Sequence, residues 1–127
     1  MLNKIFKSIL IGIFALVITT TFTSCEKEKE TIAVIIVKNS NGQTIQGADV
    51  ILFPEQIPNP TSGDFPDPSL TKGPEETDSN GRVQFTYELE AILNIEVTKV
   101  DGNSTYTGAN IIRLLKGKTV TKVVEIN

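Results

Sequence analysis

The sequence of 127 residues contains no histidine, no tryptophan and a single cysteine, Cys25. Histidine is the commonest general base near neutral pH and the commonest metal ligand. Without it, and without a second thiol, the chain cannot build Ser-His-Asp, Cys-His or ordinary zinc sites. No disulfide can form within one chain, so the fold has to depend on packing and on sheet hydrogen bonds. We therefore expect a protein that is not an enzyme and that uses no cofactor.

Positive charge is also scarce, because 12 Lys and Arg residues are outnumbered by 15 Asp and Glu residues. The net charge is −3. Proteins that bind nucleic acid need a basic surface to neutralise the phosphates. An acidic chain has no such electrostatic footprint, so no nucleic-acid partner is expected.

The N-terminus has the three-part pattern of a secretory signal. Lys4 and Lys7 precede an uninterrupted apolar run from Ile9 to Ile18, and small or polar residues follow up to Ser24. Basic, apolar and small residues in that order are typical of a cleaved, helical signal peptide. The apolar run is shorter than the ~20 residues that span a bilayer. Residues 1–24 are therefore interpreted as a signal peptide.

Cys25 lies where this signal would be cut. Phe22-Thr23-Ser24-Cys25 resembles the lipobox of bacterial lipoproteins, in which the cysteine becomes the lipidated first residue. The resemblance implies cleavage between Ser24 and Cys25 and a membrane anchor on Cys25, and two or more acyl chains hold a protein stably. It also implies the bacterial cell envelope, with the outer membrane expected and either its periplasmic or its surface-exposed face open. A plain signal cut nearby and an uncleaved anchor are the alternatives.

About 103 residues remain after cleavage, enough for one domain with a modest core. Loss of Lys4 and Lys7 changes the net charge from −3 to −5. Residues 25–30 are interpreted as the lipidated cysteine and a charged, solvated tether. Acidic residues just after the cysteine signal surface export in some outer-membrane lipoproteins, and Glu26 to Glu30 looks like such a segment. The lipid on Cys25 is the membrane contact that we expect.

From Thr31 onward the chain alternates between short apolar segments and turn signals. The expected strands are 31–38, 44–53, 82–87, 92–100 and 119–126, with weaker candidates near 70–77 and 104–110. Six or seven strands and no convincing helix predict an all-β sandwich. Side chains alternate along 82–87 and 92–100, which predicts that the inward-facing residues are Val83, Phe85, Tyr87, Leu93, Ile95 and Val97. An Asn-Gly pair after the first strand predicts a hairpin into the second. The structural positions expected at turns and small-residue sites are Asn41, Gly42, Gly47, Asp78, Asn80, Gly81, Asp101, Gly102 and Gly117.

All six prolines lie within residues 54–76, which therefore predict a long irregular loop. Such loops are usually functional or disordered. Phe65 has no obvious strand to pack on. It either folds back on the core or forms, with Asp64 and Asp67, a recognition loop.

Metal binding is weakly indicated at best. Asp64, Asp67 and Asp78 carry oxygen ligands of the kind that calcium prefers. Their spacing matches no calcium loop, and prolines separate the carboxylates in the loop. Solvated loop and turn residues are therefore the preferred interpretation, and no metal site is predicted.

Three segments resemble the carboxypeptidase regulatory-like (transthyretin-like, prealbumin-type) domains. They are Gly42 to Val50 (GQTIQGADV), Thr77 to Phe85 (TDSNGRVQF) and Leu115 to Thr119 (LKGKT). The resemblance covers most of residues 31–127 and implies an Ig/transthyretin-like Greek-key β-sandwich of about seven short strands. Domains of this family are accessory modules for adhesion, assembly or display, and they have no catalytic residues to transfer.

The direction of each strand can be counted from the tether if successive strands are antiparallel. The loop from Pro54 then begins at the tether end, beside the connections at 88–91 and 111–118. The turns at 41–42, 78–81 and 101–103 lie at the opposite end.

Together these features predict a non-enzymatic, lipid-anchored envelope protein. It would act as a binding or assembly module for another envelope protein or a glycan. The alternative is a structural or adhesive surface component, a fibre subunit or cap that self-associates through edge strands.

Overall fold

The computed structural model describes residues 27–55 and 67–127. Ser24, Cys25, Asp64 and Phe65 lie outside the described residues, so their expected roles stay predictions. Within the described ranges, no helix is long and apolar enough to cross a membrane. The elements are β1 (Thr31–Asn39), β2 (Asp49–Pro54), the 3-10 turn η2 (Pro68–Leu70), β3 (Lys72–Glu76), β4 (Arg82–Tyr87), β5 (Ala91–Asp101), β6 (Ser104–Leu114) and β7 (Thr119–Ile126).

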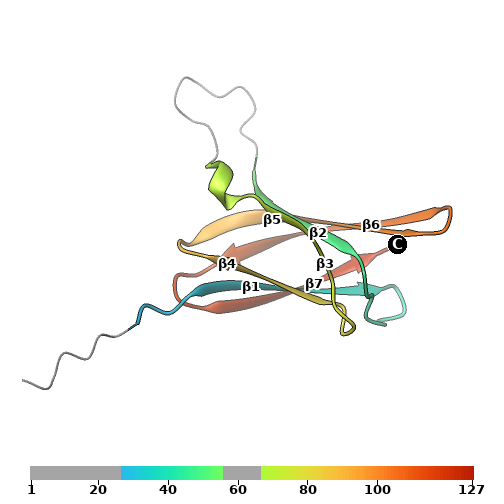
Figure 1. Cartoon of the computed structure of the whole chain (residues 1–127), viewed down its shortest axis with the longest axis horizontal. Coiled ribbons are helices and arrows are strands. Elements are labelled where there is room, and N and C mark those ends of the chain that lie inside the picture. Colours follow the sequence, from blue (N-terminus) through green and yellow to red (C-terminus); the bar gives the residue numbers. More distant parts are fainter. Residues whose placement is uncertain (1–26, 56–66) are drawn as a thin grey trace, which may run out of the picture.

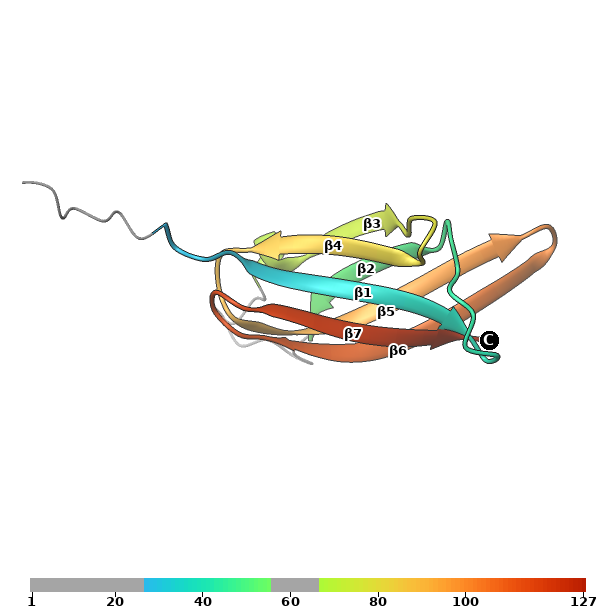
Figure 2. The same cartoon turned by 90° about the horizontal axis from the view of Figure 1, so that it is seen from below.

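The strands form the all-β sandwich that the sequence predicts. One sheet has the order β4-β1-β7 and the other the order β3-β2-β5-β6, and the two layers face each other in Figures 1 and 2. The chain passes repeatedly from one sheet to the other, which is the connectivity of Greek-key sandwiches. The ladders are antiparallel except for β1 and β7, the first and last strands, which pair in parallel.

The core fills the space between the two sheets, and the predicted alternation sets which residues enter it. Val83, Phe85 and Tyr87 of β4 are buried, while the intervening residues are exposed. On β5 the buried residues are the expected Leu93, Ile95 and Val97. Alternation has this effect because successive side chains of a strand point to opposite faces.

The predicted hairpin between the first two strands is wrong. Residue 44 makes only one bridge to β1, at Lys38, and β2 starts five residues later in the other sheet. The segment that crosses from β1 to the other sheet is held by Thr77, which lies in the turn between β3 and β4. Its Oγ1 donates to the Ile45 carbonyl at 2.7 Å and accepts from the Ala48 N–H at 3.0 Å. The Asn-Gly turn therefore reverses the chain, but the strand that follows, β2, pairs with β3 and β5 in the other sheet and not with β1.

The β5–β6 hairpin is longer than expected. The weak strand candidate at 104–110 continues to Leu114, and β5 and β6 have 11 residues each, in register from Ala91↔Leu114 to Asp101↔Ser104. The end of the hairpin extends past the neighbouring strands in both views (Figures 1 and 2). Gly108 lets β6 lie close to β7, because a Cβ there would meet the Glu125 carbonyl oxygen.

The strand directions agree with the count from the tether. At one end, here called the tether pole, the Gly117 N–H donates to Thr31 Oγ1 at 2.9 Å. The ends of β2, β4 and β6 lie at this pole, because each of these strands runs opposite to its neighbour β1 or β5. The opposite end, the far pole, holds the turns at 40–47, 78–81 and 102–103. The long loop after Pro54 therefore starts at the tether pole.

The weak strand candidate near 70–77 is confirmed as β3. It pairs on one side only, with β2, at the edge of the four-stranded sheet. Pro74 is tolerated there because an edge strand does not need every N–H for the ladder.

Candidate binding clefts

The predicted turn residues serve the fold. Gly42, Gly47, Gly81, Gly102 and Gly117 all have positive φ angles between 60° and 79°, a region that other residues rarely adopt. The Asp78 carboxylate accepts the N–H groups of Asn80 at 2.8 Å and Arg82 at 3.0 Å. Asp101 closes the β5–β6 hairpin opposite Ser104. Near Asn41 the turn is held by Asn39, whose Oδ1 accepts from the residue 41 N–H at 3.0 Å.

The weak metal candidates that the structure describes are not brought together. Asp67 caps η2 by accepting the Ser69 N–H at 2.9 Å, and this bond, with the Ser69 hydroxyl, lowers the pKa of Asp67. Asp78 belongs to the turn at the far pole. Within residues 27–55 and 67–127, no three His, Cys, Asp or Glu side chains are grouped as metal ligands would be.

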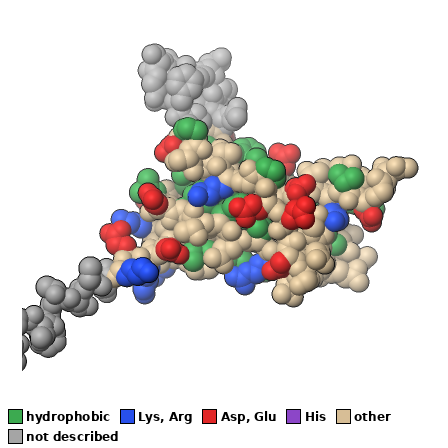
Figure 3. All heavy atoms as spheres, in the orientation of Figure 1, with side chains coloured by type: hydrophobic (Ala, Val, Ile, Leu, Met, Phe, Trp, Pro, Cys, Tyr) green, Lys and Arg blue, Asp and Glu red, His purple; other side chains and the backbone are tan. Residues whose placement is uncertain are grey.

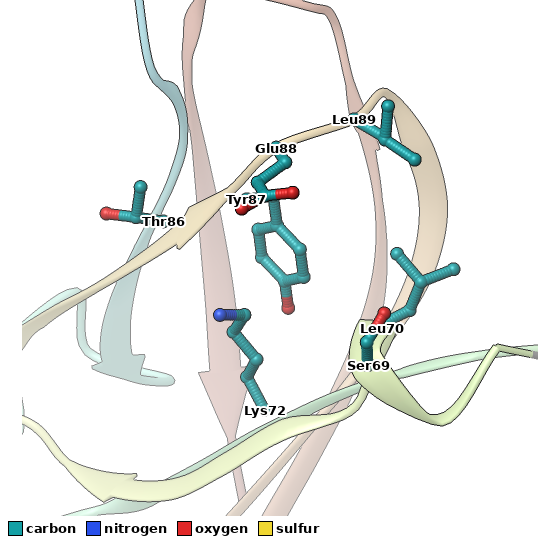
Figure 4. Close-up of a pocket in the computed structure, with 7 residues that line it drawn as sticks. All are labelled: Ser69, Leu70, Lys72, Thr86, Tyr87, Glu88 and Leu89. Carbon is teal, nitrogen blue, oxygen red and sulfur yellow. The ribbon is translucent and has the colours of Figure 1, made fainter.

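A cleft of about 350 Å³ opens at the tether pole between the edges of the two sheets. Tyr87 comes from the end of β4, and Lys72, Ser69 and Leu70 come from β3 and η2 (Figure 4). Leu89, in the connection after β4, completes one side and is 59% exposed. We call this site the Tyr87 cleft. It exists because β3 and β4 are edge strands of different sheets and scarcely contact each other.

The Tyr87 hydroxyl is the unusual group in this cleft. The residue is only 4% exposed, and its Oη has no hydrogen-bond partner among the described residues. Burial raises the pKa of Tyr87 above its ordinary value, because the charged form would lose its hydration. Figure 4 shows the hydroxyl pointing toward the segment that carries Ser69, Leu70 and Lys72. Buried polar groups are nearly always paired, so an orphaned one calls for an explanation.

Lys72 closes one side of the tyrosine. Its Nζ lies 5.1 Å from the centroid of the Tyr87 ring, within the range of a cation–π contact. The cleft therefore offers a hydroxyl that needs a partner, an ammonium group, the Glu88 carboxylate and two leucines. This combination suits a ligand with a polar group next to an apolar one.

A second cleft, of about 370 Å³, lies at the far pole. We call it the Tyr106 cleft. Tyr106 lies on β6 opposite Lys99 of β5, near the end of the long hairpin. The other side consists of the 39–41 turn, Ile45 and the last two residues of the chain.

Most of these residues were not predicted from the sequence, which indicated no role for Lys72 or Leu89. The alternation along 82–87 did predict that Tyr87 faces inward. A tyrosine in place of phenylalanine at the last inward position of a strand was the available signal, since its hydroxyl needs a partner. Charge is no guide here, because acidic and basic side chains are interspersed on the face seen in Figure 3.

The sequence was compared with models of protein families and with curated proteins, and neither comparison gives a match. The resemblance to carboxypeptidase regulatory-like domains therefore stays a prediction, as does the lipobox. The clefts have to be interpreted from their own chemistry.

Proposed function

We propose that the protein is a non-enzymatic, lipid-anchored binding module of the bacterial envelope, and that it binds a protein partner in the Tyr87 cleft. The observation that carries this proposal is the buried Tyr87 hydroxyl without a partner. A backbone amide or polar side chain of the partner would supply the missing hydrogen bond by displacing the side chains that cover the buried Oη. Leaving such a group unpaired costs about 1–3 kcal/mol, so the same bond adds to the affinity of the partner.

The surroundings of the hydroxyl favour a protein over a glycan at this pole. A sugar ring packs against a free aromatic face, but the Tyr87 ring is buried and has Lys72 over it. Leu89 is more than half exposed and Leu70 adjoins it in the cleft. Exposed apolar side chains beside a polar pocket are typical of protein contacts. The cleft also adjoins the tether, where a neighbouring envelope protein would be met.

The test is capture from membranes by the full chain with its native anchor. Tyr87→Phe removes one hydrogen bond, and Leu89→Ser removes apolar contact. Each change should reduce the amount of a specific captured protein, by about 5- to 30-fold for Tyr87→Phe. Tyr106→Phe is the matched control, because it removes the same atom at the opposite pole. Equal capture by the wild type and both cleft variants would refute the proposal.

The alternative, a fibre subunit that self-associates through edge strands, finds less support at two of the four edges, β3 and the start of β4, and β6 and β7 form the other two. The β3 edge carries Pro74 and two exposed glutamates, features that block strand addition. At the start of β4, the backbone of Arg82 is already bonded to Asp78, with Asp78 N–H to Arg82 carbonyl at 2.9 Å. A monomer in size-exclusion chromatography of the chain without Cys25 would agree with the binding module, whereas concentration-dependent oligomers would favour the fibre.

A further inference from the structure

The Tyr106 cleft is produced by a mismatch in strand length. β6 is bonded to the end of the chain at Thr107, which exchanges two backbone hydrogen bonds of 3.2 Å with Asn127. Tyr106 is the next residue toward the hairpin tip, so it lies just past the point where the opposite layer ends. Its ring is 41% exposed, although it comes from the inward face of the hairpin that Lys99 shares. The hairpin thus extends past the end of the opposite sheet, and the side chain of Tyr106 lines the cleft that this leaves open.

The floor and rim of this cleft differ in character. Ile45 and Ile126 are its apolar members, and its polar lining consists of Asn39, Lys99 and Asn127 together with Ser40, Asn41 and Asp101. The last three side chains offer a hydroxyl, an amide and a carboxylate, which can together donate and accept several hydrogen bonds. The cleft is therefore amphipathic, with a ring and aliphatic groups on one side and mostly neutral polar groups on the other.

Its basic group is already engaged. Lys99 Nζ donates to the Gly47 carbonyl at 2.9 Å, and a Cβ on Gly47 would lie 3.0 Å from that nitrogen. The ammonium is therefore held against the wall by a backbone contact. The carboxylate of Asp101 repels anions, as does the net charge of −3 of the whole chain. The charges of Lys99 and Asp101 offset each other, so the cleft has no net positive charge that would favour phosphate, sulfate or carboxylate ligands.

We infer that the Tyr106 cleft binds an uncharged glycan. A pyranose ring has an apolar C–H face that packs on an aromatic ring, and hydroxyl groups at its edge that bond to amide, hydroxyl and carboxylate groups. Tyr106 supplies the ring, and Asn41, Ser40 and Asp101 supply the polar partners. A volume of about 370 Å³ is at the lower end of the range for small-ligand sites, so it accommodates one or two sugar units.

The position of the cleft fits such a ligand. It lies at the far pole, away from Thr31 and the tether, whereas the Tyr87 cleft lies beside them. A chain anchored at its N-terminus would hold a membrane neighbour at one pole and reach a glycan with the other. The inference is independent of the proposed function, since the two clefts share no residue.

The experiment uses the mature chain from Cys25 to Asn127, coupled through its single thiol to maleimide beads. Coupling at Cys25 reproduces the direction of the anchor and leaves the far pole free. Many copies on one bead strengthen weak individual binding. The beads are applied to an array of defined neutral and sialylated glycans, and binding is read by fluorescence. We expect binding to a subset of the neutral glycans and none that requires sialic acid.

Three variants identify the site. Tyr106→Ala should reduce binding at least tenfold, whereas Tyr106→Phe should retain most of it because the ring is kept. Asn41→Ala should reduce binding about fivefold through loss of hydrogen bonds, and it provides a second test if Tyr106→Ala does not fold. Tyr87→Phe, at the other pole, should leave glycan binding unchanged and reduce only the capture of the protein partner.

The inference is overturned if no neutral glycan binds, or if binding is confined to sialylated glycans. It is also overturned if a correctly folded Tyr106→Ala or Asn41→Ala variant binds as well as the wild type. Folding is checked by the urea midpoint, which should change little because Tyr106 lies outside the buried core. Failure of glycan binding with intact protein capture would leave the Tyr87 cleft as proposed.

Discussion

Replacing Tyr87 by phenylalanine should make the free protein more stable, which is the reverse of the usual effect. A buried tyrosine that donates a hydrogen bond typically contributes about 1 kcal/mol through it. Here the hydroxyl is buried without a partner among the described residues. Its desolvation therefore counts against folding by about 1–3 kcal/mol. Phenylalanine keeps the ring and its packing and removes this penalty. We expect a gain of about 1–2 kcal/mol.

Urea unfolding of residues 25–127 measures the gain. With a slope of about 1–1.5 kcal/mol/M for a domain of this size, the midpoint should rise by about 1 M. The melting temperature should rise by several degrees, at about 4–8 °C per kcal/mol. Tyr106→Phe is the control. Its hydroxyl belongs to a residue that is 41% exposed, so its stability should stay within about 0.5 kcal/mol of the wild type.

Alkaline pH gives an independent signature of the same group. Because burial raises the pKa of Tyr87, the folded protein keeps a proton that the unfolded chain releases near pH ~10. Ionisation of Tyr87 therefore does not lower the free energy of unfolding below the unfolded pKa. As the pH rises from there through the raised pKa of the folded state, the free energy of unfolding falls. The wild type should lose stability above about pH 10 more steeply than Tyr87→Phe.

A loss of about 1 kcal/mol in Tyr87→Phe would refute the reasoning. The hydroxyl would then have a partner in the free protein, such as a bound water, and would not need one from a ligand. The stability gain and the loss of partner capture should therefore occur in the same variant.

The remaining predictions concern stability and are measured by urea unfolding. Gly81→Ala should cost about 2–4 kcal/mol, from its φ of +68° and an added Cβ only 2.8 Å from a neighbouring side chain. Gly42→Ala, at positive φ in open space, should cost only about 1–2 kcal/mol. Gly108→Ala should cost about 1–3 kcal/mol by pushing β6 off β7; a gain, as expected from chain entropy alone, would contradict this. Thr77→Val should cost about 2–4 kcal/mol and speed amide exchange at Ala48, whereas Thr77→Ser should restore both.

Local patterns predicted local features well. The alternation in β4 and β5 identified the buried faces, because side-chain direction has a period of two along any strand. Glycines beside Asn or Asp identified the turns, because a tight turn needs a residue with positive φ and glycine adopts it without strain. The strand directions also followed, since they need only the order of strands and reversals.

Pairing could not be predicted in this way. The Asn-Gly turn after β1 indicated a hairpin, yet β1 pairs with strands that follow it by some 50 and 90 residues along the sequence. Thr77, distant in sequence, directs the crossing segment into the other sheet. A turn motif determines that the chain reverses, whereas the burial of apolar residues between the two sheets determines which strand the reversed segment pairs with.

By itself, the sequence determined the class of fold, the inward faces, the turns and the two poles, because each depends on neighbouring residues. The N-terminal pattern at Cys25 and the expectation of a lipid anchor also come from the sequence alone. Only the tertiary structure decided which side chains form sites. The Tyr87 hydroxyl is left unpaired by what lies opposite it on β3 and η2. Tyr106 is exposed because β7 ends short of the tip of the β5–β6 hairpin. Both conditions depend on where distant segments stop, which no local pattern encodes.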